Sequence, residues 1–265
     1  MGSSIKLNLR NYPSLNEERV DLTLKQPLIF AHRGANSFAP ENSLVAFDKA
    51  IKLGCHGIEL DVRICASGEV VVFHDRTLSR MTGAKGKIQQ QNLSQLRDLR
   101  LLHPLFPNER IPTLSEVLDL IGKSMLINID IKKSTFSKNR IEEKILKILA
   151  DKKFEENIII SSFNPFVLKK IAALNPRLHT GFILSNRSSM MILNGHPVKS
   201  LHARHPILNN RYLHRLLRRA QQVFAWTVDD ESSMLKLIAM KIDGIITNRP
   251  ELLLALQHKM DQPGS

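Results

Sequence analysis

Short apolar segments of strand length alternate with longer segments of helical periodicity along most of the chain. In Glu41–Leu53, for example, Leu44, Phe47 and Ile51 recur at the spacing of one helix face. The segments typical of strands are Pro27–Ala31, Gly57–Arg63, Val70–Phe73, Met125–Ile131, Asn157–Ser162, His179–Ile183, Val198–Ala203, Gln222–Thr227 and Asp243–Thr247. Helices are predicted between most of them, over Glu41–Leu53, Thr113–Ile121, Ile141–Leu149, Pro165–Leu174, Asn209–Ala220, Glu231–Met240 and Pro250–Lys259.

This alternation predicts one fold class. A parallel strand needs a crossover element before the next strand, so strand–helix alternation favours a parallel sheet. Leaving Val70–Phe73 aside, eight strands remain, which predicts an α/β fold of the (β/α)8 TIM-barrel type. We expect an N-terminal extension over residues 1–26 and one domain over 27–260, with a small, irregular insertion at 75–112 after the second strand. The weakest unit lies at Ser185–Pro197, where little helical pattern is visible.

Composition and charge limit the kinds of partner and the location that the sequence predicts. The chain carries 38 Lys and Arg against 25 Asp and Glu, a net charge of +13, which indicates an anionic partner such as nucleic acid, lipid head groups or a phosphorylated substrate. Its longest apolar runs fall far short of the roughly 20 residues that span a bilayer. The first 25 residues lack the apolar core of a secretory signal, so we expect a cytoplasmic location. The two cysteines, Cys55 and Cys65, lack metal-site spacing and are expected to be inert.

Acidic residues interrupt two of the apolar strands. Glu59 and Asp61 are two positions apart, so both side chains leave the same face of their strand, and Asp130 on another strand could complete a cluster. Like charges this close favour a bound cation, and oxygen ligands suit Mg²⁺ or Ca²⁺. The alternative is a set of salt bridges to neighbouring Arg and Lys. Their position at the catalytic end of a barrel favours one divalent cation.

Histidines and cations follow the same strands. His32 and His74 stand at two strand ends, where a pair of imidazoles could act as general acid and general base in phosphodiester cleavage. The sequence does not assign the two roles between them. Arg33 and Lys132 offer fixed positive charge for a phosphoryl oxygen, or they could simply neutralise the acids.

The order of these residues resembles a known family. Ala31–Gly83 contains His-Arg-Gly, Pro-Glu-Asn, Gly-Ile-Glu-Leu-Asp-Val and Val-Val-Phe-His-Asp, and later matches fall at Asn128–Lys132, Ser161–Phe163, Trp226–Asp230 and Asp243–Pro250. Together these motifs resemble the glycerophosphodiester phosphodiesterase family, which has a (β/α)8 barrel. The resemblance extends over about Pro27 to Leu256, nearly the whole chain.

The resemblance implies roles position by position. It implies acid–base catalysis for His32 and His74, and divalent-cation ligation for Glu59, Asp61 and Asp130. It implies that Arg33 and Lys132 bind the phosphate and that Glu41 lies at the same end of the barrel. It places Trp226 in the pocket for glycerol or the leaving alcohol. It also implies that the 75–112 insertion caps the barrel mouth.

Two positions depart from the family pattern. Asp130 stands where the family usually has Glu, and its side chain is one methylene shorter, which puts the metal preference in question. Asn248 stands where the family usually has Asp. If that position caps a helix N-terminus, Asn caps nearly as well and the change would be silent.

The predicted function is metal-dependent hydrolysis of glycerophosphodiesters to sn-glycerol 3-phosphate and an alcohol, with a small phosphodiester as the partner. A lysophospholipase D-type activity on lipids is the alternative, and the charge leaves open a weak association with an anionic membrane surface. A catalytically inactive, anion-binding barrel is the third hypothesis. A solvated helix face explains the basic cluster Arg211, Arg215, Arg218 and Arg219 more simply than base stacking, because aromatic residues make up only 5% of the chain, so no nucleic-acid partner is expected. We interpret the histidines His196, His202 and His205 as rim and loop residues.

Overall fold

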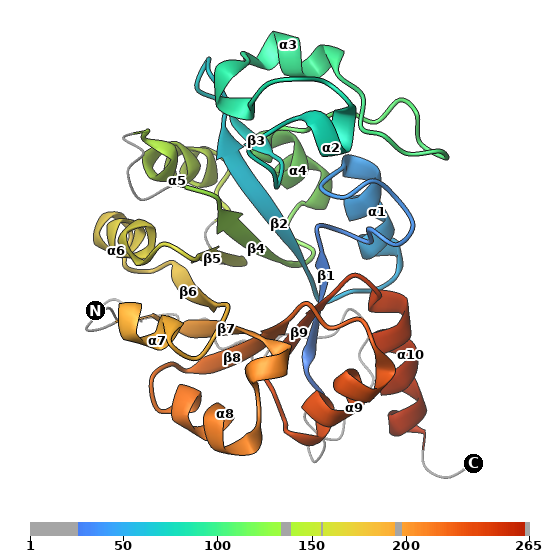
Figure 1. Ribbon diagram of the computed structural model, residues 1–265, viewed down its shortest axis with the longest axis vertical. Coiled ribbons are helices and arrows are strands. Elements are labelled where there is room, and N and C mark those ends of the chain that lie inside the picture. Colours follow the sequence, from blue (N-terminus) through green and yellow to red (C-terminus); the bar gives the residue numbers. More distant parts are fainter. Residues whose placement is uncertain (1–25, 134–138, 155, 194–197, 263–265) are drawn as a thin grey trace.

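A closed ring of eight parallel strands forms the centre of the molecule. The computed structural model describes residues 26–133, 139–154, 156–193 and 198–262. The ring follows the sequence as β1 Leu28–His32, β2 Gly57–Ile64, β4 Leu126–Ile131, β5 Ile158–Ser162, β6 His179–Leu184, β7 Ser200–Arg204, β8 Gln222–Trp226 and β9 Gly244–Thr247. It closes because β1 pairs in parallel with both β2 and β9 (Figure 1). The predicted TIM barrel is confirmed.

Helices cover the outside of the ring, as the crossover rule requires. They are α1 Leu44–Lys52, α4 Leu114–Ile121, α5 Ile141–Asp151, α6 Pro165–Leu174, α7 Ser189–Ile192, α8 Asn210–Leu217, α9 Glu231–Ala239 and α10 Pro250–Asp261. The predicted capping box at the start of α4 is present, with Thr113 and Glu116 bonding each other's backbone N–H groups. The weak unit at Ser185–Pro197 contains only the one-turn helix α7, and residues 194–197 lie outside the described part of the chain.

The inside of the barrel is filled at its lower end by a layer of large side chains. Phe30 and Phe224 meet edge to face with their ring centroids 5.5 Å apart. Two glycines make room for these rings. A Cβ atom at Gly57 would lie 2.5 Å from the Phe30 ring, and one at Gly244 would lie 2.4 Å from the Phe224 ring. The layer closes the bottom of the barrel, so a ligand can enter only at the carboxyl ends of the strands.

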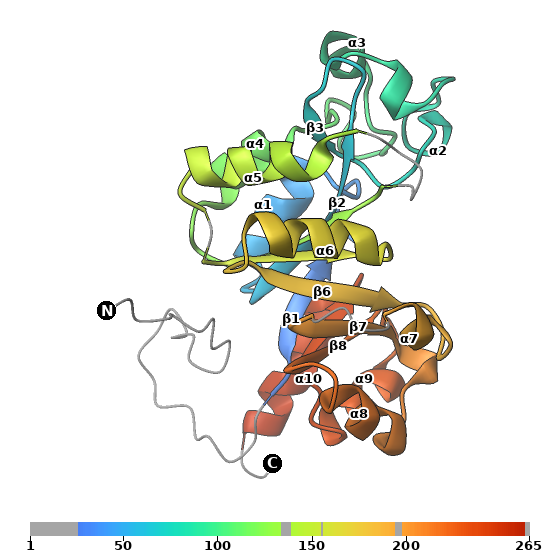
Figure 2. The same cartoon turned by 90° about the vertical axis from the view of Figure 1, so that its left-hand side faces the viewer.

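A small subdomain follows β2. Strand β3 Val70–Val72 pairs antiparallel with β2, and the chain then forms α2 Ser79–Thr82, the 3₁₀ turn η2 Ile88–Gln90 and α3 Leu93–Asp98. It has a separate core of buried side chains: Cys65, Val71, Phe73, Leu78, Ile88, Leu96, Leu101 and Ile111. Figures 1 and 2 both show α2 and α3 at the top of the view, at the opposite end from α8. The stretch expected to be irregular thus contains three short helical turns on a core of its own.

One histidine lies elsewhere than the sequence suggested. His202 belongs to β7 and is buried inside the barrel, not on a rim or loop, so that interpretation was wrong. Its Nδ1 accepts from the Asn128 side chain at 3.4 Å, and its Nε2–H donates to Ser200 Oγ at 3.0 Å. Side chains along a strand alternate between the two faces of the sheet, and residue 202 falls on the face that points into the barrel. Its side chain is therefore buried although it is polar. His205 lies on the 3₁₀ turn η3 His205–Ile207, and His196 lies outside the described residues.

Within the described residues, no helix is long and apolar enough to cross a membrane.

Two buried histidines should make folding stability depend on pH. Burial lowers the pKa of both His179 and His202 to about 3, so both stay neutral in the folded protein. An unfolded chain protonates its histidines below about pH 6.5. The unfolded state therefore binds more protons as the pH falls toward 4, and the free energy of unfolding should decrease over that window.

His202→Gln removes one of these two groups, so the urea midpoint should depend less steeply on pH between about 6.5 and 4.5. His258→Gln, at an exposed position on α10, is the control and should leave the slope unchanged. An unchanged slope in His202→Gln would contradict the prediction.

Candidate functional site

Three buried carboxylates lie together at the carboxyl ends of two neighbouring strands. Asp61 of β2 is in register with Asp130 of β4, and Glu59 is two positions earlier on the same face of β2. Glu59, Asp61 and Asp130 each offer an oxygen within 4.8 Å of the others. Parallel register, which the sequence alone could not specify, brings the third acid beside the first two.

Two cations balance this cluster. Lys132 Nζ lies 2.9 Å from Asp61 Oδ1 and 2.5 Å from Asp130 Oδ2, and Arg33 Nε lies 3.2 Å from Asp61 Oδ2. Burial raises the pKa of Asp61, but the charges of Lys132 and Arg33 outweigh it and hold that pKa well below its usual range. Burial likewise lowers the pKa of Lys132, yet Asp130 and Asp61 outweigh it and raise that pKa. Asp61 and Lys132 are therefore both charged.

The remaining members of the cluster fit a divalent cation. Burial, together with the charges of Asp61 and Asp130, raises the pKa of Glu59 well above its usual range. Asp130 Oδ1 is buried and has no hydrogen-bond partner among the residues that the structure describes. A bound cation would stabilise the ionised Glu59 and give this orphaned oxygen a partner, and an all-carboxylate set suits a hard ion. The three acids could therefore hold one divalent ion.

His32 is held through a relay of two further side chains. Asp229 accepts hydrogen bonds from the Asn248 backbone N–H at 2.8 Å and from its Nδ2 at 2.7 Å. This turns Asn248 Oδ1 toward His32 Nδ1, 2.6 Å away, so Nδ1 carries the proton. Burial, with the nearby charge of Arg33, lowers the pKa of His32 to about 4. His32 is therefore neutral, with an unprotonated Nε2 3.9 Å from Glu59 Oε2.

Asn248 does not cap a helix. The N-cap of α10 is Arg249, which makes no capping hydrogen bond through its side chain. The condition under which Asn in place of Asp would be silent, a capping role for residue 248, is therefore not met. Its amide orients His32, where an Asp would place a second carboxylate against Asp229.

His74 has a charged partner. Its Nδ1 lies 2.6 Å from Asp75 Oδ1, and the other oxygen of Asp75 accepts from Arg80 Nε at 2.6 Å. Burial raises the pKa of Asp75, but the hydrogen bonds from Arg80 and His74 outweigh it and hold that pKa at about 2. The carboxylate is ionised, so it can balance a positive imidazole. The two histidines thus differ in partner: a neutral amide for His32 and a carboxylate for His74.

Arg63 fixes the backbone beneath the site. Its Nε and Nη2 donate to the carbonyl oxygen of His74 at 2.9 and 2.6 Å, and its Nη1 donates to that of Lys132 at 3.3 Å. One side chain therefore ties the segment that carries His74 to the end of β4.

The acids and histidines share one pocket with an apolar wall. The cavity has a volume of about 260 Å³, and His32, Arg33, His74 and Lys132 line it together with the three acids. Its other lining residues are Asn128, Phe163, Ile183, His202, Trp226 and Ile246. Trp226 Nε1 donates to the His202 carbonyl at 2.9 Å, and Phe163 meets the Trp226 ring edge to face. One half of the pocket is charged and the other half is apolar.

Glu41 lies beside this pocket. The lining residues do not include it, and its carboxylate pairs with Arg33 Nη1 at 2.9 Å and with Arg80 Nη2 at 2.6 Å. Glu41 thus holds the Arg33 side chain in place without lining the pocket itself. The structure therefore brings eight of the nine predicted site residues into one cavity and puts Glu41 behind them.

Sequence reasoning missed several contributors. Asn42 adopts a left-handed backbone conformation with φ 58°, and its Nδ2 donates to Asp61 Oδ2 at 2.8 Å. Asn tolerates this conformation better than most residues, and its place in the Pro-Glu-Asn motif was the available signal. Asp229 lies in a matched motif but received no role. Phe163 likewise lies in a matched motif without an assigned role, whereas Arg63 reaches the site only through tertiary contacts.

Known proteins share this architecture. A sequence model described as the glycerophosphoryl diester phosphodiesterase family matches residues 32–252. The glycerophosphodiester phosphodiesterase of Caldanaerobacter subterraneus subsp. tengcongensis is 36% identical over 241 residues, which cover 88% of this chain and 98% of that protein.

Solved structures are similar over the same range. A phosphodiesterase of Oleispira antarctica, in complex with the product sn-glycerol-3-phosphate, superposes with a TM-score of 0.81 at 27% identity, covering 89% of this chain and 98% of that one. A glycerophosphodiester phosphodiesterase of Thermotoga maritima gives a TM-score of 0.71 at 29% identity, covering 87% and 98% of the two chains.

The acid cluster predicts stabilisation by divalent cations. Because a ligand that binds only the folded state stabilises it, Mg²⁺ or Ca²⁺ at 100 times its dissociation constant should add about 2.7 kcal/mol to the free energy of unfolding. Asp61→Asn should remove most of this gain, which thermal unfolding with chelator and metal add-back measures.

Glu142→Gln is the matched control for this variant. Glu142 is also buried, but it pairs with Lys133 at 2.7 Å outside the cluster. The variant should lower the baseline stability and keep the metal response. A full response in Asp61→Asn would count against a metal site here.

Proposed function

The chain belongs to the glycerophosphoryl diester phosphodiesterase family and is a phosphodiesterase, so we propose that it hydrolyses glycerophosphodiesters to sn-glycerol 3-phosphate and an alcohol such as choline or ethanolamine. The observation that carries this proposal is the single pocket that collects three carboxylates, two cations and two histidines with different partners. The sn-glycerol-3-phosphate in the Oleispira antarctica structure supports the glycerol phosphate half of the substrate.

Glu59, Asp61 and Asp130 would hold one Mg²⁺ or Ca²⁺. When bound, the cation supplies Lewis-acid stabilisation of the charge on the phosphoryl group. The Asp130 side chain is shorter than the Glu usual in the family, and Lys132 Nζ forms an ion pair with its Oδ2 at 2.5 Å. Its free oxygen, Oδ1, is the one available for the ion.

Arg33 and Lys132 bind the phosphate in this proposal. Each is fixed by the acid cluster, so neither loses much side-chain freedom when substrate arrives. Arg33 is also held by Glu41, which leaves its Nη2 for a phosphoryl oxygen. The cations therefore serve two purposes, since they balance the charge of the acids and attract the anionic substrate.

His32 acts as the general base. Its Nδ1–H is committed to Asn248, and its lowered pKa, about 4, leaves Nε2 unprotonated at neutral pH. Nε2 removes the proton from the nucleophile, which is either the glycerol 2-hydroxyl or water. A cyclic phosphate forms in the first case, and water then opens it.

His74 acts as the general acid. The ionised Asp75 on its Nδ1 balances the charge of an imidazolium, whose Nε2–H protonates the departing alkoxide. The apolar wall of Phe163, Ile183 and Trp226 receives the alcohol. Phe163, which is 44% exposed, lies where the alcohol would leave the pocket.

Release of sn-glycerol 3-phosphate tests the activity itself. A coupled assay with glycerophosphocholine and glycerophosphoethanolamine should detect release that chelator abolishes and Mg²⁺ or Ca²⁺ restores. Lysophosphatidylcholine in the same assay tests the lipid alternative, which the exposed Phe163 ring favours. Faster turnover of the lipid would make the alternative correct, and no release from any diester would refute the proposal.

The acid and base roles can be separated by the leaving group. A p-nitrophenolate is a stable anion that leaves without being protonated. The alkoxide of choline is far more basic and must receive a proton as it leaves. His74→Ala should therefore lose about 100-fold or more in kcat on glycerophosphocholine but far less on glycerophospho-p-nitrophenol. His32→Ala should lose a similar factor on both substrates, because the nucleophile must be deprotonated in each case.

Asn248→Leu provides a positioning control. It removes the acceptor that orients His32, so kcat should fall about 10- to 100-fold on both substrates with little change in KM. Asn248→Asp keeps an acceptor for Nδ1–H and should recover part of the loss.

Equal losses for His74→Ala on the two diesters would refute the assignment of His74 as the acid.

A further inference from the structure

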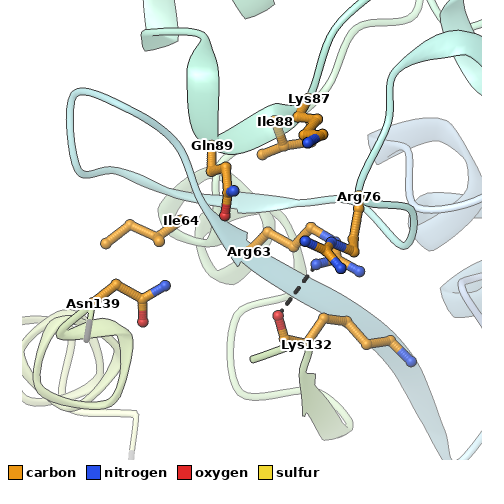
Figure 3. A pocket seen from close by; sticks show the side chains of 8 residues that line it. All are labelled: Arg63, Ile64, Arg76, Lys87, Ile88, Gln89, Lys132 and Asn139. Carbon is orange, nitrogen blue, oxygen red and sulfur yellow. Dashed lines mark hydrogen bonds between the residues drawn. The ribbon is translucent and has the colours of Figure 1, made fainter. Parts of the chain in front are cut away.

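A second, smaller pocket lies between β2 and the small subdomain. It has a volume of about 20 Å³, and its lining includes Arg63, Arg76, Lys87, Ile88 and Gln89 (Figure 3). Arg63 comes from β2, Arg76 from the segment after His74, and Lys87 from the residue before η2. In Figure 3 the Lys132 ammonium points away from the other lining side chains, in keeping with its ion pairs to Asp61 and Asp130. The pocket therefore contains three cations that do not belong to the catalytic cluster.

No described carboxylate lies within salt-bridge distance of these three cations, although Asp61, Asp75 and Asp130 act on Arg63 from farther away. The hydrogen bonds of Arg63 go to carbonyl oxygens, and neither Arg76 nor Lys87 forms a salt bridge with a described residue. The nearest acid in sequence, Asp75, is already shared by His74 and Arg80. Cations gathered around one pocket repel each other unless an anion lies between them.

We propose that this pocket is an anion-binding site, separate from the catalytic pocket, that takes a phosphate, sulfate or carboxylate group. Arg76 presents a planar fork of donors and Lys87 a mobile ammonium, a combination that suits a group with several oxygens. The Gln89 side chain can add a neutral donor.

The size of the pocket limits what enters it. A volume of about 20 Å³ has room for little more than one water-sized group. The anion therefore inserts one or two oxygens between the cations, and the rest of the molecule stays in solvent. This favours the end of a flexible anionic group over a whole buried ligand.

The new site adjoins the catalytic machinery through Arg63. This side chain lines the small pocket and also holds the His74 and Lys132 carbonyls. An anion here lies behind the segment that positions the general acid. Two sources share the required chemistry: a free inorganic anion, or an anionic group on the alcohol half of a substrate. Only the second source rests on the proposed function.

Sulfate binding tests the site without any activity measurement. The metal-loaded protein is melted with increasing sulfate at ionic strength held constant with chloride. The double variant Arg76→Gln/Lys87→Gln is compared with Arg211→Gln/Arg215→Gln, which removes the same charge from exposed positions of α8 at the other end of the molecule (Figure 1). The catalytic pocket is intact in both variants, so sulfate bound there affects both equally.

The sulfate-dependent rise in melting temperature should fall to about half or less in Arg76→Gln/Lys87→Gln, since two charged hydrogen-bond donors are lost. It should match the wild type in Arg211→Gln/Arg215→Gln. Equal responses in the two double variants would overturn the proposal, because they would show that only general screening is at work.

Kinetics then identify the source of the anion. If the substrate carries it, KM for glycerophosphoserine rises about tenfold in Arg76→Gln/Lys87→Gln while KM for glycerophosphocholine is unchanged. If the anion is free, both KM values are unchanged and only the sulfate response is lost. A wild-type protein inactive on every diester would defeat the proposed function and leave the sulfate result standing.

Discussion

The structure depends on the electrostatic balance of three carboxylates buried side by side. Glu59, Asp61 and Asp130 are almost fully removed from water, and isolated charges there would be strongly destabilising. Arg33 and Lys132 compensate part of the charge, while the raised pKa of Glu59 and the orphaned Asp130 oxygen mark the part that remains. The three acids thus form an incompletely neutralised cluster of the kind that suits a divalent cation. The same imbalance that costs stability provides the affinity for a cation.

The barrel makes such a cluster feasible. Its lower interior is filled largely by aromatic rings packed against glycines, and the charged residues gather at the open end. Closure between β1 and β9 brings Asn248 and Asp229, from the end of the chain, next to His32 near its start. This rim of the barrel is therefore assembled from segments more than 200 residues apart in sequence. Strand register, which is set by the core, places each side chain.

The two histidines show how surroundings give one residue type two different chemical environments. His32 ends β1 and His74 lies just after β3, and nothing in the local sequence distinguishes their environments. His32 is buried against an amide whose orientation Asp229 dictates, whereas His74 is more exposed and paired with an ionised carboxylate. The small subdomain contributes to this second environment, because Arg80 of α2 holds Asp75 and Arg63 holds the His74 backbone. The insertion therefore supports the site as well as bordering it.

The sequence by itself determined the barrel and most of the residues at its mouth. Strand–helix alternation and the position of polar residues at strand ends are local signals, and they pointed to Glu59, Asp61, Asp130, His32 and His74, which line one pocket in the structure. The second core under the short helices 79–98 was missed, because its apolar residues are spaced too irregularly to show a period. Tertiary structure alone decided that Asn248 orients a histidine, that His202 faces inward, and that Arg63, Arg76 and Lys87 meet at one pocket. Those outcomes follow from strand register and from contacts between distant segments, which no local pattern encodes.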